Sequence, residues 1–262
     1  MNNANLTTKA KITWCPGCPN SQILVAFRKV ILDLVADNSL QIENLVAFAG
    51  IGCHGKISDY INVNTFTSLH GRLIPAMTGA KCANPKLTVV GFSGDGDSYD
   101  EGIEHLIHAA KRNSDINLFI HDNQIFALTT GQFDAASPKG FKGKSTPHGS
   151  IEEPINPLLL MLSAGATFVA RSYAGDIAGT EKIMKAAIAH KGFSFVDIIQ
   201  PCITFFDTRD HFKEKTYSIP EDLPKTDLKA AMEKVHGDPD GKIPLGIFYQ
   251  VEKPTFEGEL YK

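Results

Sequence analysis

Apolar residues recur with two different periods along the chain, and each period predicts a different kind of element. An apolar, β-branched run at residues 87–92, which ends at a glycine-rich turn, is typical of a buried strand. A second apolar run at residues 116–121 predicts another strand. Between the two, apolar residues stand at positions i, i+3, i+4 and i+7 of a helix, namely Ile103, Leu106, Ile107 and Ala110. The pattern therefore predicts a strand–helix–strand unit at residues 87–121.

The same alternation continues on both sides of this unit. We expect further strands at residues 45–49, 167–171 and 193–199. We expect further helices at residues 157–164, 180–190 and 228–235, from residue 67 toward Ala83, and from Asn20 or Ser21, either of which can cap its helix. This order predicts an α/β fold with a doubly wound, mostly parallel sheet flanked by helices. Residues 132–154 are polar and aperiodic, which is typical of a functional loop or a partner contact.

Length and composition are those of an ordinary globular protein. The 262 residues carry a formal net charge of −3 and are 43% hydrophobic, without the basic excess that would indicate nucleic acid or an anionic membrane surface as a partner. No run of 18 apolar residues predicts a spanning helix, and the polar start lacks the apolar core of a signal peptide. We expect a flexible lead-in at residues 1–13 and one α/β domain at residues 14–210. A C-terminal extension at residues 211–262, with a turn at 237–241, is expected to pack on this domain or on a partner subunit.

Oxygen-bearing side chains follow both strands of the central unit. Asp95 lies in the turn after the first strand, and Asn123 follows Asp122 after the second strand. Because the carboxyl ends of parallel strands meet at one edge of a sheet, Asp95 and Asn123 are expected to lie close together. A carboxylate and an amide oxygen suit Mg²⁺, which also binds phosphate oxygens, and the adjacent helix N-terminus favours a phosphate. The spacing indicates a Mg²⁺–diphosphate site, and the alternative is an ordinary acidic turn.

Four of the five cysteines are expected at the same edge of the sheet. Cys15 and Cys18 form a C-x-x-C pair directly before the first helix, while Cys53 and Cys202 each follow a predicted strand. Four converging thiolates hold either a tetrahedral zinc ion or a 4Fe–4S cluster, and the spacing does not discriminate between the two. Cys82 lies in a helical segment and is expected to be a buried structural thiol. Cysteines in this arrangement, without a secretion signal, indicate a cytoplasmic protein rather than a disulfide framework.

The residues around the expected diphosphate site resemble a known motif. Gly94–Gly96, which reads Gly-Asp-Gly and is followed at a distance by Asn123, is similar to the diphosphate-binding motif of thiamine-diphosphate enzymes. The similarity extends through residues 122–123 and 127–132, and this longer pattern looks like the β subunit of 2-oxoacid:ferredoxin oxidoreductases. The resemblance implies the thiamine-diphosphate-binding fold, in its diphosphate-binding type of domain.

The cysteine segments resemble the same family. Trp14–Cys18, Gly50–Cys53 and Pro201–Cys202 look like the three segments that supply cluster ligands in these β subunits. The chain departs from the family pattern at Pro19, where a glycine is usual after the second cysteine. The resemblance favours a 4Fe–4S cluster over zinc.

Members of this family oxidatively decarboxylate a 2-oxo acid with coenzyme A, which yields an acyl-CoA and CO₂ and reduces ferredoxin. The resemblance thus implies thiamine diphosphate, Mg²⁺ and a 4Fe–4S cluster as cofactors, and pyruvate or 2-oxoglutarate as the 2-oxo acid. In the family, the glutamate that activates the thiamine lies on a different subunit. The resemblance therefore implies an α-type partner subunit in a heterodimer or an α2β2 assembly, and a chain that is inactive alone.

The resemblance also implies roles for individual residues. Asp95 and Asn123 would bind Mg²⁺ through their side chains, and Ile125 through its carbonyl. Lys56 would contact the diphosphate or the substrate carboxylate, and His70 the cofactor or the substrate; a solvated lysine and a structural histidine are the alternatives. The residues expected to bind cofactor are Gly52, Lys56, His70, Gly94, Asp95, Gly96, Asp97, Asn123, Ile125, Thr129 and Thr130. The expected ligands of the cluster are Cys15, Cys18, Cys53 and Cys202.

Two other interpretations stay open at this point. The first is a non-redox, thiamine-dependent decarboxylase or synthase subunit whose cysteines bind zinc. The second is a non-catalytic interaction module stabilised by zinc, which would leave the arrangement of Asp95 and Asn123 unexplained.

Overall fold

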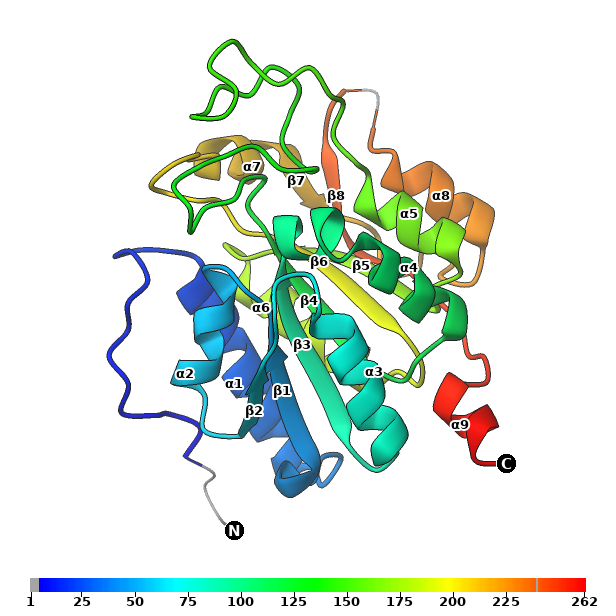
Figure 1. Cartoon of the computed structure of the whole chain (residues 1–262). Helices are drawn as coiled ribbons and strands as arrows, with labels where there is room; N and C mark the ends of the chain where they lie inside the picture. The colour runs from blue at the N-terminus through cyan, green and yellow to red at the C-terminus, as the bar shows by residue number, and fades with distance from the viewer. Residues whose placement is uncertain (1–4, 239) are drawn as a thin grey trace.

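The computed structural model describes residues 5–238 and 240–262 of the chain. The strands of these residues form one central sheet (Figure 1). Within these ranges the strand order is β2-β1-β3-β4-β6-β5-β8-β7. The strands are β1 (Leu45–Ala49), β2 (Asn64–Thr67), β3 (Thr88–Gly94), β4 (Asn117–Asp122), β5 (Phe168–Tyr173), β6 (Ser194–Ile199), β7 (Thr216–Ser218) and β8 (Ile243–Gln250). All neighbouring strands pair in parallel except β5 and β8, which are antiparallel. The expected mostly parallel sheet is confirmed.

Helices cover both faces of this sheet, as a doubly wound fold requires (Figure 1). They are α1 (Asn20–Ala36), α2 (Ile57–Tyr60), α3 (Leu73–Ala83), α4 (Ile103–Arg112), α5 (Pro157–Ala164), α6 (Ile177–Ala189), α7 (Arg209–Lys215), α8 (Leu228–Val235) and α9 (Phe256–Leu260). The core on one face contains residues of α1 and α6, and the core on the other contains residues of α3, α4, α5 and α8. In the described ranges, no helix has both the length and the apolar character that crossing a bilayer requires.

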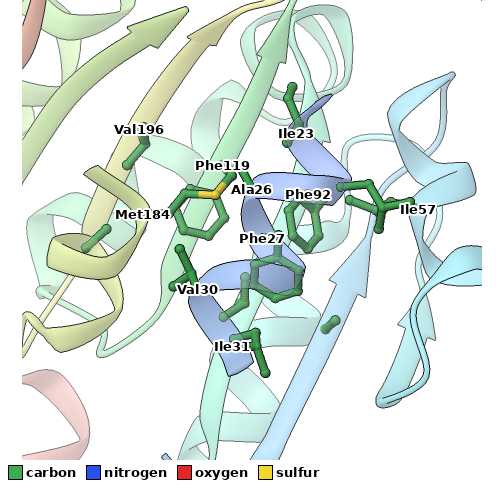
Figure 2. Close-up of a cluster of buried hydrophobic side chains, with 14 of the residues drawn as sticks. Ile23, Ala26, Phe27, Val30, Ile31, Ile57, Phe92, Phe119, Met184 and Val196 are labelled. Atoms are coloured by element: carbon green, nitrogen blue, oxygen red, sulfur yellow. The ribbon is translucent and has the colours of Figure 1, made fainter. Parts of the chain in front are cut away.

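The apolar stripe of α1 fills the core on its face of the sheet. Figure 2 shows Phe27 and Val30 of α1 near Phe92 of β3 and Phe119 of β4. The rings of Phe27 and Phe92 meet edge to face with centroids 4.8 Å apart, and both side chains are fully buried. Burial of an aromatic side chain stabilises a fold by about 1.5–3 kcal/mol. This contact therefore anchors α1 to the strand that carries the glycine-rich turn.

The first turn of α1 differs from the expectation. Pro19 is the N-cap residue and no side chain caps the helix, so the predicted cap by Asn20 or Ser21 is wrong. The Asn20 side chain is buried instead, with its Oδ1 2.7 Å from Nδ1 of His121 near the carboxyl end of β4. This contact places the start of α1, and the cysteines just before it, at the carboxyl edge of the sheet.

The described parts of both terminal segments contact the rest of the chain. Within the expected lead-in at residues 1–13, Leu6 is buried and Thr7 pairs with Ile61, whereas residues 9–13 are exposed. In the C-terminal extension, β8 pairs with β5 and β7 pairs with β8, so the extension continues the sheet. The expected turn at residues 237–241 includes Pro239, which lies outside the described residues.

Candidate functional site

The carboxyl ends of β1, β3 and β4 enclose a cavity that we call the acidic cavity. It is lined by Ile51–His54, His70, Gly94–Asp97, Asn123 and Ile125–Thr129. The structure therefore brings together the predicted cofactor residues, with the exception of Lys56 and Thr130. These two lie outside this lining.

The Asp95 carboxylate joins the ends of β3 and β4. Its Oδ1 accepts a hydrogen bond from the backbone N–H of Gly96 (3.0 Å). Its Oδ2 accepts bonds from the backbone N–H groups of Asn123 (2.7 Å) and Gln124. These bonds fix the loop that presents the Asn123 side chain to the cavity.

The Asn123 side chain has an oxygen without a partner. Its Oδ1 is buried and accepts no hydrogen bond from any described residue, although leaving a buried acceptor unpaired costs about 1–3 kcal/mol. A hard cation that prefers oxygen ligands would satisfy this atom. The carbonyl of Ile125, a residue that also lines the cavity, could supply a further oxygen. The residues of the acidic cavity therefore fit a Mg²⁺ ion.

Three interacting carboxylates, those of Asp95, Asp122 and Asp134, are buried at this edge of the sheet. Burial, reinforced by the other two carboxylates, raises the pKa of Asp95 well above its usual value. Burial and the charge of Asp197 likewise raise the pKa of Asp122, and burial and Asp100 raise the pKa of Asp134 to about 6. A cation nearby would favour the ionised forms, so the electrostatics also suit Mg²⁺. Among the described residues, no three His, Cys, Asp or Glu side chains form a metal site by themselves.

The Asp97 carboxylate binds neighbouring segments together. Its Oδ1 accepts a hydrogen bond from the backbone N–H of Gly71 (2.8 Å), and its Oδ2 accepts one from the hydroxyl of Ser93 (2.6 Å). Two histidines flank it, with Nε2 of His54 3.6 Å from Oδ2 and Nδ1 of His70 3.8 Å from Oδ1. Burial alone would raise the pKa of Asp97, but His54 and the two hydrogen-bond donors hold it below its usual value. Asp97 is therefore ionised, and its contacts connect the loop that carries Gly71 and His70 to the glycine-rich turn.

His54, which the sequence does not single out, fills the space beside two of the predicted glycines. A Cβ atom on Gly94 would lie 2.7 Å from Cε1 of the His54 ring. A Cβ atom on Gly52, whose φ is +154°, would lie 2.6 Å from the same atom. These distances are shorter than nonbonded carbon atoms tolerate, so the packing of His54 requires glycine at both positions.

A second cavity, which we call the cysteine cavity, lies beside the first. All four predicted ligand cysteines line it, together with Trp14, Asn20, Lys56 and Gln200, among others. The five cysteines of the chain are free thiols. Cys82, expected to be buried, is only half-buried and lies apart from this cavity, in the last turn of α3.

The surroundings of Cys18 and Cys53 oppose the ionisation of their thiols. Burial, together with the charges of the other three cysteines, raises the pKa of Cys18 to about 11, although the backbone N–H of Asn20 lowers it in part. Burial also raises the pKa of Cys53, against the lowering effect of Lys56. Thiolates here need a positive charge nearby, which a bound metal centre supplies. The Gln200 side chain also donates toward Sγ of Cys18 through Nε2, at 3.9 Å. Four cysteine thiols with a hydrogen-bond donor beside them fit a cluster of iron and sulfur.

Trp14 connects the C-x-x-C segment to the loop after β1. Its Nε1 donates a hydrogen bond to the carbonyl of Cys53 (2.6 Å), and its ring meets the ring of Tyr60 edge to face with centroids 4.7 Å apart. The Tyr60 hydroxyl in turn accepts a bond from the backbone N–H of Thr13 (2.8 Å). These contacts hold two of the cysteine segments in fixed relation.

The two cavities have a common wall. Cys53, Asn123 and Ala127 line both of them. Lys56 lines the cysteine cavity only, with its Nζ 3.3 Å from the carbonyl of Thr13. The sheet edge therefore places a thiol cage and an oxygen-rich cavity side by side.

The remaining predicted residues lie at the outer side of these cavities. His70 and Thr129 line the acidic cavity, and Thr129 is exposed. Thr130 is also exposed, and its hydroxyl accepts a hydrogen bond from Nζ of Lys144 (2.7 Å) instead of facing either cavity.

Comparison with known proteins bears on both cavities. Residues 50–198 match the family model of the C-terminal thiamine pyrophosphate binding domain of thiamine pyrophosphate enzymes. Residues 202–262 match the C-terminal part of the pyruvate ferredoxin oxidoreductase beta subunit. A 2-oxoacid:ferredoxin oxidoreductase subunit beta from a Sulfolobus species is 38% identical, over 94% of this chain and 85% of the relative. The corresponding subunit 1 protein of Aeropyrum pernix is 37% identical, over 98% of this chain and 84% of the relative.

The chain belongs to the family of 2-oxoacid:ferredoxin oxidoreductase β subunits. Its fold agrees, because this β subunit superimposes on a solved 2-oxoglutarate:ferredoxin oxidoreductase from Magnetococcus marinus with a TM-score of 0.93. The two are 35% identical, and the match covers 100% of this chain and 89% of that chain. The family resemblance and the thiamine-diphosphate-binding domain are confirmed, and the chain is an oxidoreductase subunit. This membership decides against a non-redox decarboxylase or synthase subunit and against a non-catalytic interaction module.

Some residues at the cavities of this β subunit were not predicted from the sequence. His54 directly follows Cys53 in a glycine-rich loop, and Gln200 directly precedes Pro201-Cys202 at a strand end, so proximity to a cysteine is a usable signal for both. Asp134 has no such signal, because it lies in an aperiodic loop and reaches the other carboxylates only through the fold.

Proposed function

We propose that this β subunit binds Mg²⁺–thiamine diphosphate in the acidic cavity and a 4Fe–4S cluster in the cysteine cavity. With an α-type subunit it catalyses the coenzyme A-dependent oxidative decarboxylation of a 2-oxo acid and reduces ferredoxin. The observation that carries this proposal is the common wall of Cys53, Asn123 and Ala127, which supports two cofactors acting on one substrate.

The chain's own residues would position the Mg²⁺–diphosphate group. The Asp95 and Asn123 side chains and the Ile125 carbonyl hold the ion, a role supported by the unpartnered Oδ1 of Asn123. Gly94 and Gly96 leave room beside the turn for the rings of His54 and Phe126, and backbone bonds from the strand-end loop orient Asp95. When bound, thiamine diphosphate supplies the nucleophilic carbon and the electron sink that decarboxylation of a 2-oxo acid needs.

His70 and Lys56 would act on opposite sides of the common wall. The Nδ1 side of the His70 ring faces Asp97, which leaves its other nitrogen available to the cofactor or the substrate in the acidic cavity. Lys56 lies at the cysteine cavity, where its charge suits the substrate carboxylate better than a diphosphate held by Asn123. Thr129 would line the cofactor channel, whereas Thr130 lies outside it, paired with Lys144.

The four cysteines would hold the cluster, which accepts single electrons when bound. Cys15, Cys18, Cys53 and Cys202 share one cavity although they come from three separate segments. Their state as free thiols suits a reducing compartment, and a cytoplasmic location fits this chemistry.

An α-type subunit would close the acidic cavity and supply the activating glutamate. Apolar side chains with exposed surface stand at this edge, namely Ile51 and Leu128, which line the acidic cavity, Phe205, which lines the cysteine cavity, and Leu69, which is 76% exposed and precedes His70. Exposed apolar groups of this kind favour burial against a partner. We propose a heterodimer or an α2β2 assembly.

The substrate we propose first is 2-oxoglutarate, because the solved relative from Magnetococcus marinus holds 2-oxoglutarate, coenzyme A and succinyl-CoA. Pyruvate is the alternative. The test is to purify the chain anaerobically with its α-type subunit and to measure coenzyme A-dependent viologen reduction with each acid. We expect activity only from the two subunits together, and broad visible absorption from the cluster. Activity of the β subunit alone would refute the shared site, and a colourless preparation without iron would refute the cluster.

A further inference from the structure

Two buried amide side chains border the cysteine cavity, and the proposed function leaves both without a role. Asn20, in the first turn of α1, is 1% exposed, and Gln200, directly after β6, is 2% exposed. Both line the cavity together with the four cysteines. Buried amide groups normally form hydrogen bonds, so each of these two side chains is expected to have a hydrogen-bond partner.

The orientation of the Asn20 amide follows from its neighbour. Asn20 Oδ1 lies 2.7 Å from Nδ1 of His121, and because a carbonyl oxygen can only accept, the His121 ring donates through Nδ1–H. The other end of the amide, Nδ2, is then the group available to the cavity. This nitrogen is buried and has no hydrogen-bond partner among the described residues.

The Gln200 amide is also oriented as a donor. Its Nε2 donates to the carbonyl of Pro201 (3.0 Å) and lies 3.9 Å from Sγ of Cys18, within the range of an N–H···S hydrogen bond. The cavity therefore presents amide N–H groups from two side chains to a space whose other lining groups include four sulfur atoms.

We propose that Asn20 and Gln200 donate N–H···S hydrogen bonds to the cluster and its cysteine ligands, and that His121 is a positioning residue for the Asn20 amide. This inference rests on the proposed cluster. Reduction adds negative charge to the cluster sulfurs, so donors directed at them stabilise the reduced state more than the oxidised state. The two amides therefore raise the reduction potential of the cluster.

The test is a potentiometric titration, monitored by electron paramagnetic resonance, of the complex with the α-type subunit, purified anaerobically. Asn20→Leu and Gln200→Met remove the donors while keeping similar side-chain volumes. We expect each to shift the midpoint potential to a more negative value. For Asn20→Leu the ratio of reduced to oxidised cluster at a fixed potential should fall about tenfold, which is about 59 mV for one electron.

The role of His121 has its own readout. His121→Phe leaves the Asn20 amide unanchored and should shift the potential in the same direction, but less than Asn20→Leu does. The double variant should shift no further than Asn20→Leu alone, because His121 acts through Asn20. A separate additional shift would overturn the positioning role.

Asn117→Leu is the matched control. Asn117 is also a buried asparagine with one unpartnered amide atom, Oδ1, but it begins β4, at the opposite end of the strand from the cavities. This variant should leave the potential unchanged. It separates a general effect of losing a buried amide from an effect at the cluster.

The outcomes distinguish the inference from the proposed function. A wild-type complex that contains no cluster signal defeats the proposed cluster itself. A cluster that is present with an unchanged potential in both Asn20→Leu and Gln200→Met overturns the inference alone. If Asn20→Leu does not assemble the cluster, Asn20→Ala, which also removes the donor, and His121→Phe decide, and unchanged potentials in both overturn the role of Asn20.

Discussion

Replacement of Asn123 by leucine should have opposite effects on stability and on cofactor binding. In the folded chain the Asn123 Oδ1 atom is buried and accepts no hydrogen bond from a described residue. An unpaired buried acceptor costs about 1–3 kcal/mol, and leucine has a similar size without the polar atoms. The cofactor-free Asn123→Leu variant should therefore be as stable as the wild type, or more stable by about 1 kcal/mol.

Binding of Mg²⁺–thiamine diphosphate should weaken in the same variant, because the variant lacks one of the oxygen ligands that we propose for the ion. An interaction with a charged group contributes about 1.5–3 kcal/mol, which is about 10- to 100-fold in affinity. Urea unfolding of the cofactor-stripped protein measures the stability. Isothermal titration calorimetry of thiamine diphosphate with Mg²⁺ measures the affinity.

Asn117→Leu is the control for cofactor binding. It loses the hydrogen bond from Nδ2 to the carbonyl of Val89 (3.2 Å), but it also loses an unpartnered buried Oδ1 atom, far from the cavities. The two effects on stability oppose each other, so this variant should change stability by less than about 1 kcal/mol and bind the cofactor normally. The argument fails if Asn123→Leu is clearly less stable than the wild type while its affinity for the cofactor is unchanged.

Three further predictions follow from the same edge of the sheet. Asp97→Asn removes the charged acceptor of the Gly71 N–H, and should lower the free energy of unfolding at pH 7 by about 1–3 kcal/mol in urea titrations. Because burial raises the pKa of Asp134 to about 6 in the folded chain, the folded state binds this proton more tightly than the unfolded state. The stability of the cofactor-free protein should therefore fall as the pH rises from about 4 to about 6, and Asp134→Asn should flatten this dependence. Cys202→Ala should lose iron and visible absorption, whereas Cys82→Ala should retain both, and equal losses would contradict the assignment of the cavity.

The fold was predictable where a regular apolar pattern runs through an element. β1, α5 and α8 have the predicted bounds, because continuous or helically spaced apolar residues mark them from end to end. β2 has no such mark, since all four of its residues are exposed and it pairs only along one edge. α2, α7, β7 and α9 are short as well, and local contacts rather than a periodic pattern define them.

The site was predictable as far as strand order brings loops together. Parallel pairing of β3 and β4 is sufficient to place Asp95 beside Asn123, and the expectation needed only that rule. Strand order does not predict the direction of a side chain at a turn or at the start of a helix. Asn20 could cap its helix or turn inward, and only the position of His121 in the folded sheet decides between the two. The contacts of Asp97 with His54 and His70 likewise depend on three loops meeting in space.

The residues shared by the acidic cavity and the cysteine cavity also link the charges on their two sides. Charges that face each other across Cys53, Asn123 and Ala127 interact through protein, where solvent and salt screen them less than at a surface. Negative charge gained on the cysteine side favours a cation, and disfavours an anion, on the acidic side. By thermodynamic reciprocity, a cation bound on the acidic side makes negative charge on the cysteine side easier to acquire. With the proposed cofactors bound, the change in metal affinity on reduction and the change in electron affinity on metal binding are therefore two measurements of one coupling energy.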